Sequence, residues 1–423
     1  MQVNSEGRAY GRTKGTSDLS LVQCGPQTSG GELLRRYWQP VALSSEATEL
    51  PRLLKVLDEE LILFRDREGR PGLLYPRCAH RGTSLLYGKV EAQGIRCCYH
   101  GWMFDVEGRC VETPCEPHRT NHGSIRQPWY PLIEKFGLVF AYMGPADRQP
   151  PFPTFSIEES LAPDEKLVAF LNTSGPNGPH PKIAAKADFN WWQTFDNFMD
   201  PFHVVITHYS INGAQFCESL GILPEVRFEY TGDGVRAVQK RRMPDGQMHQ
   251  RVSQVIMPNM HCTPGVTDED LGRSGIGWIV PQDDTSFRHF RLFRVSSASN
   301  QMSNLQSIGM LQDDWGPQHG KPFSEWSLED HQRWQTDYVA QKGQGDISLH
   351  SEEHLSGIDA GIAMARRMFK KQAEVAAAGG DPVGAGVGSV RRVDILAGNA
   401  LFTCDGGALV AGYDPLGASA QGR

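Results

Sequence analysis

Two short cysteine–histidine pairs are the part of the sequence best suited to bind a metal. One residue separates Cys78 from His80, and two residues separate Cys97 from His100. Thiolate sulfur and imidazole nitrogen are ligands for zinc and for iron–sulfur centres, so four of them on two loops predict a metal site. A structural zinc ion is one interpretation, although zinc ribbons usually carry Cys-x-x-Cys pairs.

The order Cys-x-His followed by Cys-x-x-His resembles the ligand pattern of a Rieske [2Fe–2S] cluster. There two Cys bind one iron and two His bind the other, which raises the reduction potential above that of an all-Cys cluster. The neighbouring Arg81-Gly82 and Gly101-Trp102 also resemble Rieske loops, where Gly permits close approach of the backbone to sulfur. We therefore favour this cluster over zinc. Its predicted ligands are Cys78, His80, Cys97 and His100.

Two absent cysteines indicate which class of Rieske protein the pattern resembles. Respiratory Rieske proteins carry an additional disulfide between the two loops, whereas Thr83 and Tyr99 stand at those two positions here. Cys98 is out of register for that disulfide, and we expect it to be a small buried residue. The pattern is similar instead to the lower-potential clusters of Rieske oxygenases, which pass electrons to a second iron.

A second iron needs a second set of ligands, and the stretch DNFMDPFHVVITH at 196–208 supplies two imidazoles. On an ideal α-helix His203 lies near an apolar stripe, while His208 lies about 140° further round. Both can reach one metal only if the helix ends or bulges between them, as helices do at functional sites. The alternative is a buried His and a surface His on one regular helix. The stripe consists of Trp192, Phe195, Met199, Phe202 and Ile206.

A carboxylate would complete this second site, because two His and one carboxylate leave half of an octahedral Fe(II) open for O₂ and substrate. The candidates are Asp330 and Asp337. The chain resembles the phthalate dioxygenase-like branch of Rieske oxygenases, which includes aryl ether O-demethylases. In that branch an Asp-containing helix precedes a Gly-Pro-Ile-like turn and a Glu-His-Leu stretch, here 345–347 and 353–355, with Asp346 in place of Pro. This register implies that Asp337 is the iron ligand and that Asp330 is a solvated helix residue.

The resemblance extends over 31–372 and implies how the two iron sites would work together. In the family, head-to-tail packing in a ring places the cluster of one subunit beside the iron of its neighbour. Carried onto this chain, His100 of one subunit would bond Asp200 of the next subunit, and Asp200 would hold His203. Asn197 would be a polar neighbour of the iron. This arrangement implies a closed cyclic oligomer, a homotrimer.

The function implied by the resemblance is that of the oxygenase component of a multicomponent enzyme. It would use O₂ and electrons from NADH to hydroxylate, dihydroxylate or O-demethylate an aromatic, carboxylated compound. A separate reductase or ferredoxin would deliver the electrons, because the sequence shows no nucleotide-binding fingerprint. The alternative is a Rieske electron-transfer protein with an unrelated ligand-binding domain.

A substrate carboxylate would need a basic partner, and the strand-like stretch 287–295 offers two. Period-two alternation places Arg291 on one face with Phe287 and Phe293, and Arg294 on the opposite face. Either guanidinium is able to bind a carboxylate with two hydrogen bonds. An Arg on the solvent face of a sheet is the commoner situation, so neither is assigned to the site.

The elements that position these residues predict an α+β protein of more than one domain, as 423 residues would suggest. A Pro-rich junction at 144–155 marks the main boundary. The resemblance implies a catalytic domain of the helix-grip, START-like type, an antiparallel sheet flanked by helices. A capping box at Ser29 predicts an early helix, and a last helix is expected from Ile358. The predicted parts are an N-terminal arm and short helix at 1–37, a β-rich Rieske domain at 38–147, a mononuclear-iron catalytic domain at 148–378 and a Gly-rich C-terminal segment at 379–423.

Composition excludes some classes of function. The net charge is −7, so the chain lacks the basic excess of a nucleic-acid-binding protein. No apolar run approaches the roughly 18 residues of a membrane span, and the first residues lack the apolar core of a secretion signal. Nine Cys without the spacing of a disulfide framework favour reduced thiols. We therefore expect a cytoplasmic enzyme.

Overall fold

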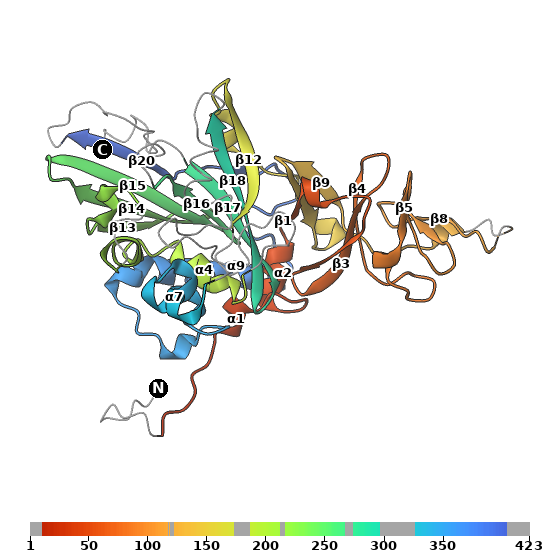
Figure 1. The fold of residues 1–423 in the computed structure, drawn as a ribbon, viewed down its shortest axis with the longest axis horizontal. Helices are drawn as coiled ribbons and strands as arrows, with labels where there is room; N and C mark the ends of the chain where they lie inside the picture. The colour runs from red at the N-terminus through yellow and green to blue at the C-terminus, as the bar shows by residue number, and fades with distance from the viewer. Residues whose placement is uncertain are drawn as a thin grey trace.

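Two β-rich parts lie next to each other along the long axis of the molecule in the computed structural model (Figure 1). The structure describes residues 11–116, 118, 122–172, 187–211, 216–266, 274–296 and 326–403. The first part carries the two Cys/His pairs on short hairpins at one end. The second part carries the two His of the 196–208 stretch beneath a large sheet.

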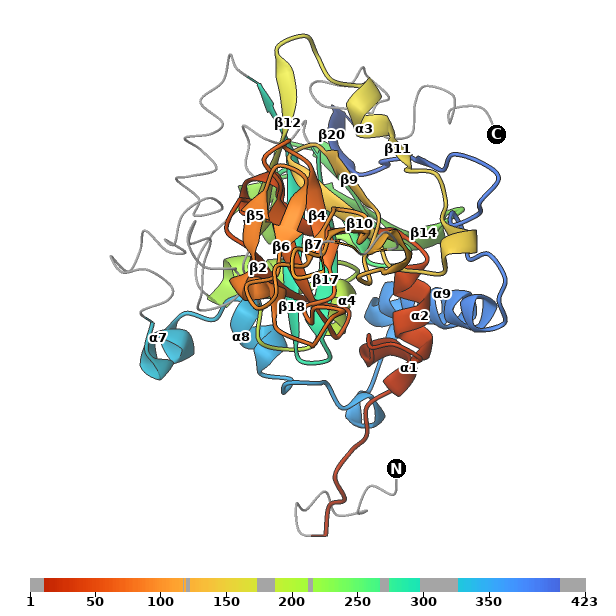
Figure 2. The same ribbon diagram turned by 90° about the vertical axis from the view of Figure 1, so that its right-hand side faces the viewer.

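The N-terminal helices α1 (Leu19–Val22) and α2 (Ser29–Arg35) precede the first sheet. The predicted helix at Ser29 is confirmed, but its cap is Thr28, whose side chain accepts a hydrogen bond from the Gly31 N–H. Glu32 accepts from the Gln27 N–H instead of completing a capping box. Helix α2 packs beside the last helix of the chain (Figure 2), which ties the two ends of the described fold together.

Three small antiparallel sheets make up the first part, and the strands of each sheet are given below in spatial order. They are β1 (Trp38–Leu43), β10 (Leu138–Tyr142) and β9 (Leu132–Lys135); β2 (Arg52–Val56), β3 (Glu59–Arg65) and β4 (Pro71–Leu74); and β5 (Lys89–Glu91), β6 (Gly94–Arg96), β7 (Met103–Phe104) and β8 (Cys110–Glu112). A separate apolar core that includes Ile62, Phe64, Ile95 and Phe104 lies under the Cys/His loops. The loops therefore rest on a packed support of their own.

An eight-stranded antiparallel sheet forms the second part, as the sequence predicts for the catalytic domain. In spatial order it contains β12 (Glu165–Asn172), β18 (Ser286–Ser296), β17 (Ser274–Asp283), β16 (Met260–Pro264), β15 (Gln247–Ile256), β14 (Gly234–Arg242) and β13 (Glu225–Tyr230), while β20 (Gly398–Thr403) pairs with β15. Short β11 (Thr154–Phe155) pairs in parallel with β19 (Arg392–Val393), and α3 (Ser156–Glu159) follows β11. The described part of the Gly-rich C-terminal segment thus contributes β20 to the large sheet and β19 to a separate two-stranded sheet.

Helices cover one side of this sheet (Figure 1). They are α4 (Trp191–Asn197), α5 (His203–Val205), the π-helix Ile206–Ile211, α8 (Asp337–Lys342) and α9 (Ala360–Ala377), while α7 (Leu328–Arg333) lies at the periphery of this layer (Figure 2). Helix α9 packs closely on β13, where Gly361 lies against the Phe228 ring. The last helix begins two residues later than predicted, because Ile358 lies in an exposed 3₁₀ turn. Within the described ranges, no helix has the length and apolar character needed to cross a membrane.

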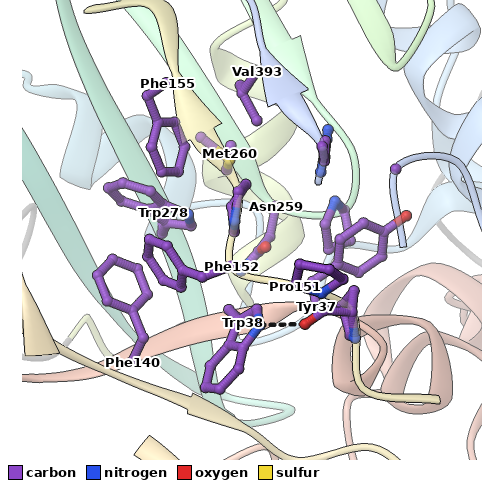
Figure 3. A pocket seen from close by; sticks show the side chains of 15 residues that line it. Tyr37, Trp38, Phe140, Pro151, Phe152, Phe155, Asn259, Met260, Trp278 and Val393 are labelled. Atoms are coloured by element: carbon purple, nitrogen blue, oxygen red, sulfur yellow. Dashed lines mark hydrogen bonds between the residues drawn. The ribbon is translucent and has the colours of Figure 1, made fainter. Parts of the chain in front are cut away.

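The junction between the two parts is tightly packed. The Arg288 guanidinium donates to both Glu46 carboxylate oxygens at 2.8 and 2.7 Å, and the Leu57 N–H donates to the Pro281 carbonyl at 2.9 Å. The Trp38 indole N–H donates to the Pro150 carbonyl at 3.0 Å, so the Pro-rich segment is held between the sheets (Figure 3). An aromatic-lined cavity of about 30 Å³ remains there, room for a single water molecule.

Candidate metal centres

The two Cys/His loops have nearly the same backbone conformation. The Gly82 N–H donates to the Cys78 carbonyl at 2.8 Å, and the Gly101 N–H donates to the Cys97 carbonyl at 3.1 Å. Both glycines lie in the left-handed region, with φ values of +74° and +73°. A residue with a Cβ is strained there, which explains why each loop carries Gly four residues after its Cys.

The four predicted cluster ligands converge at the tips of these loops. Cys78 and Cys97 are buried, the His80 and His100 rings lie 4.5 Å apart and partly exposed, and the Trp102 ring stacks on His80 at 4.4 Å. No three of the four donor atoms lie within 4.8 Å of one another, whereas a single tetrahedral zinc ion would need such a group. This spacing does not suit a single tetrahedral zinc ion.

Gln127 is a buried residue that the sequence did not single out. Its side-chain oxygen accepts from the Ala79 N–H at 2.8 Å, and its amide donates to the Tyr75 and Arg77 carbonyls at 2.8 Å each. It therefore fixes the backbone on both sides of Cys78. The side chain comes from the strand-free segment after β8, so only the folded structure reveals the contact.

Replacing Gln127 with Leu is expected to destabilise the first loop, because three partly buried backbone groups lose their partners, each at a cost of up to about 1–3 kcal/mol. We expect a lower melting temperature and faster loss of the visible cluster absorbance on incubation with a chelator. Gln93→Leu, at an exposed position of the same part, is the matched control. Equal cluster retention in the two variants would contradict the role of Gln127.

The expectation that Cys98 is buried is wrong. Cys98 lies exposed at the tip of the second loop, next to an exposed Tyr99. The Arg81 guanidinium lies over the Tyr99 ring, 5.5 Å from its centroid. Because Cys97 and His100 turn inward as ligands, the two residues between them are forced outward. The tip of the cluster part is thus an exposed surface of aromatic and basic side chains.

The chain changes from an α-helix to a π-helix between the two predicted His ligands. Helix α4 ends at Asn197, α5 begins at His203, and the π-helix begins at Ile206. The predicted bulge between His203 and His208 is therefore confirmed, and the regular-helix alternative is wrong. Ile206, expected on the apolar stripe, is half exposed because the π-helix shifts the faces.

His203, His208 and Asp337 come together at one point. The Asp337 Oδ1 atom lies 3.2 Å from His208 Nε2 and 3.6 Å from His203 Nε2, and the three donor atoms all lie within 4.8 Å of one another. Asp337 is the first residue of α8, capped by Thr336. Asp330 instead caps α7 through Ser327, so Asp337 is the carboxylate that reaches the two His.

The electrostatics of this group suit a cation. Burial alone would raise the pKa of Asp337, but His208, His203 and the Asn197 amide outweigh burial and hold the pKa below its usual range. The Asn197 amide nitrogen lies 3.4 Å from His203 Nε2, beside the converging donor atoms. Two imidazole nitrogens and one carboxylate oxygen form the ligand set that binds non-haem Fe(II) with positions left open.

Asp200 orients His203 from outside the ligand group. Its Oδ1 atom accepts from the Phe202 N–H at 2.9 Å and the His203 N–H at 3.2 Å, while the His203 Nδ1 atom bonds the Asp200 carbonyl. Its Oδ2 atom lies 3.7 Å from Nδ1. The partly exposed carboxylate lines an open groove of about 500 Å³, which we call the Asp200 groove. Its lining includes Asp200, Asn197, Glu352, Glu353, Asp359 and Arg366.

Two supporting contacts near the metal group were not foreseen. The Phe216 ring packs on the His208 ring at 4.5 Å. The Arg366 guanidinium of α9 donates to the Asp196 and Glu353 carboxylates at 3.0 Å each. Burial raises the pKa of Asp196 to about 7 although Arg366 opposes this shift. Asp196 was detectable in the sequence as the acidic residue inside an apolar helix, but Arg366 was not.

Comparison with known proteins identifies the first part. The Rieske [2Fe–2S] domain family matches residues 37–131, which contain both Cys/His loops. The match makes the zinc interpretation wrong and agrees with the donor spacing of the loops.

Two curated relatives match nearly the whole chain. It is 41% identical over 401 residues, covering 94% of this chain and 95% of the relative, to the phenoxybenzoate dioxygenase subunit alpha of Ectopseudomonas oleovorans. The chain is also similar to the tert-butanol monooxygenase / tert-amyl alcohol desaturase oxygenase subunit of Aquincola tertiaricarbonis. The two are 35% identical over 394 residues, which cover 88% of this chain and 80% of the relative. These identities confirm the resemblance drawn from the sequence.

The fold is also that of solved oxygenases. The crystal structure of dicamba monooxygenase bound to dicamba superposes with a TM-score of 0.58 at 19% identity, covering 82% of this chain and 99% of that chain. The cofactors are thus a Rieske [2Fe–2S] cluster and a mononuclear non-haem iron, for which the two sites described above have fitting donor sets. The chain belongs to the Rieske non-haem iron oxygenases, as an oxygenase subunit of the phthalate dioxygenase-like branch.

Proposed function

We propose that this chain oxidises an aromatic, carboxylated compound with O₂ at a mononuclear iron held by His203, His208 and Asp337. The observation that carries the proposal is the convergence of these three donor atoms within 4.8 Å of one another. The related phenoxybenzoate dioxygenase subunit supports an aromatic acid as substrate. The reaction would be a hydroxylation, a dihydroxylation or an O-demethylation.

The residues of the chain have distinct tasks in this proposal. Cys78 and Cys97 bind one iron of the cluster, and His80 and His100 bind the other. The mononuclear iron supplies O₂ activation when it is bound with open positions. The surrounding residues support the ligands: the Asp200 carbonyl fixes the His203 ring, Asn197 offers an amide beside the donor atoms, and Phe216 packs on the His208 ring.

The electrons would come from NADH through a separate reductase or ferredoxin and would enter at the cluster of a neighbouring subunit. The cluster hairpins and the metal-site helices lie at opposite ends of one chain (Figure 1), which favours transfer between subunits. The cluster tip exposes Arg77, Arg81 and Lys89, and the Asp200 groove is lined by four acidic residues besides Asp196. This charge complementarity supports head-to-tail contact, in which His100 bonds Asp200 of the next subunit. Closure of such contacts gives a cyclic assembly, for which we propose a homotrimer.

Metal analysis of the purified protein tests the two-site proposal directly. We expect about three irons and about two acid-labile sulfides per chain, with a Rieske-type visible and EPR spectrum. Removing the mononuclear iron with a mild chelator should abolish product formation, and Fe(II) should restore it. About two irons per chain, with no additional bound Fe(II) after incubation, would instead indicate an electron carrier with a ligand-binding domain.

The substrate class is tested by a screen of methoxylated and carboxylated aromatic compounds with a matching reductase. Substrate-dependent O₂ uptake with NADH oxidation indicates oxygenation, and release of formaldehyde identifies O-demethylation. O₂ uptake supported only by aliphatic alcohols would contradict the aromatic assignment.

A further inference from the structure

The buried arginines among the described residues fall into two groups that differ in their partners. Three of them form ion pairs with acidic residues: Arg35 with Glu59, Arg36 with Asp381 and Arg288 with Glu46. The other three lie on the large sheet and bond only neutral groups: Arg241, Arg251 and Arg291. Buried guanidinium groups are normally paired, because removing a charge from water costs several kcal/mol. The sheet therefore carries buried positive charge without a matching carboxylate in the described chain.

Arg241 and Arg251 lie together on the helix-covered face of the sheet. Arg251 on β15 pairs in register with Gln239 on β14, two residues before Arg241. The Arg241 Nε atom donates to the Ile222 carbonyl at 2.9 Å, and its Nη2 atom donates to the Gln239 side-chain oxygen at 3.0 Å. Its Nη1 atom is buried and has no hydrogen-bond partner. The guanidinium is thus held in place by two bonds and keeps one unused donor.

Arg251 adds a second positive charge beside Arg241. It donates to the Gly265 and Pro264 carbonyls at 2.7 and 3.2 Å. Burial lowers the pKa of Arg251 to about 9, with repulsion from Arg241 as a further cause, and burial lowers the pKa of Arg241 to about 10. Both remain charged at neutral pH. Burial lowers the pKa of the neighbouring His249 to about 4, so His249 is neutral there.

A short segment connects the Arg241–Arg251 pair to the metal ligands. Phe216 at one end packs on the His208 ring, and Ile222 at the other end accepts the hydrogen bond from Arg241. The intervening 3₁₀ turn Glu218–Gly221 contacts both α5 and the π-helix. The two arginine charges without a carboxylate partner are therefore separated from the proposed reaction site by the 3₁₀ turn Glu218–Gly221.

We propose that the Arg241–Arg251 pair binds the carboxylate of the substrate, with Arg241 Nη1 as the donor that reaches it. The inference rests on the proposed function and extends it: the substrate is an elongated aromatic acid whose reacting end lies at His203, His208 and Asp337. A bound carboxylate would supply the negative charge that the described chain does not. Arg291 is separate from this pair, because its guanidinium bonds the Thr263 hydroxyl at 3.0 Å and lies over the Phe293 ring.

The test is calorimetric binding to the oxidised holoprotein without reductase, so that turnover plays no part. The probes are benzoate, vanillate and 3-phenoxybenzoate, each compared with its primary amide. We expect at least one acid to bind about tenfold or more tightly than its amide. Arg241→Met should weaken binding of that acid roughly 30-fold and leave the amide nearly unchanged, because only the acid loses a buried charge pair.

Matched variants separate the site from a general charge effect. Lys240→Met removes the adjacent positive charge on the opposite, exposed face of β14 and should change neither affinity. Arg241→Lys should retain part of the preference for the acid, which a purely structural role would not predict. The proposal would be overturned if the wild type preferred no acid over its amide, or if Arg241→Met kept that preference. It would also be overturned if only Arg291→Met lost the preference. If the protein binds an acid through Arg241 but oxidises no aromatic compound when a reductase and NADH are supplied, the proposed function is refuted and the carboxylate site remains supported.

Discussion

Asp337→Ala is expected to abolish product formation while the Rieske spectrum stays intact. The Asp337 carboxylate is the single anionic donor among the three atoms that converge on the mononuclear site. Its loss should lower mononuclear iron from about one per chain toward zero and reduce turnover by more than about 100-fold, since even indirect support of a ligand is worth 10–100-fold. Iron and sulfide analysis, visible absorbance and product formation measure these effects together.

Asp330→Ala is the matched control for this prediction. Asp330 belongs to the preceding helix and bonds Ser327 at the helix start, away from the two His. Its loss should cost some stability of α7 and leave mononuclear iron and turnover near wild-type values. Normal iron content in Asp337→Ala, or equal loss in Asp330→Ala, would disprove the assignment of Asp337.

Asp200→Asn is expected to stop the transfer of electrons from the cluster without emptying the iron site. The amide oxygen of Asn can still accept from the Phe202 and His203 N–H groups, and the backbone carbonyl of residue 200 still bonds His203 Nδ1, so the ring of His203 stays oriented. The negative charge that would bond the partner subunit's His100 is lost. Turnover should fall by about 10- to 100-fold, the range for residues that support metal ligands.

Stopped-flow absorbance separates the steps of this prediction. Reduction of the cluster by the reductase should proceed at the wild-type rate, whereas reoxidation of the cluster in the presence of substrate and O₂ should become slow. Asp359→Asn is the control, because Asp359 lines the same groove and only caps a 3₁₀ turn. Near-normal turnover in Asp200→Asn would disprove the electron-transfer role, and loss of mononuclear iron would show that Asp200 is structural.

The sequence was most informative where local spacing decides the geometry. The two Cys/His loops are defined by ligand and Gly positions within five residues, so their turn conformation follows from chain geometry alone. The spacing of His203 and His208 was likewise sufficient to require a bulge, because a regular helix separates two such residues by about 140°. The π-helix satisfies this requirement.

The sequence was least informative where residues distant along the chain become neighbours. Asp337 lies 129 positions after His208, so its choice over Asp330 depended on a family register. Gln127 reaches the first cluster loop from a separate segment, and the Arg241–Arg251 pair exists only because β14 and β15 are neighbours in that register. Cys98 was misjudged because the two residues between Cys97 and His100 face outward while the ligands turn inward. These contacts depend on tertiary packing, which residue types alone do not specify.

The tight junction between the two parts has a consequence for how activity depends on protein concentration. Arg288 bonds Glu46 and the Pro-rich segment packs between the sheets, so the described junction is rigid. We therefore expect that the cluster cannot move toward the iron of its own subunit. If electrons cross only between protomers, an isolated protomer is folded but cannot transfer electrons from its cluster to a mononuclear iron. Specific activity should then fall sharply when the protein is diluted below the dissociation constant of the proposed homotrimer. The inactive protomers would still be folded and would keep the brown colour of the cluster.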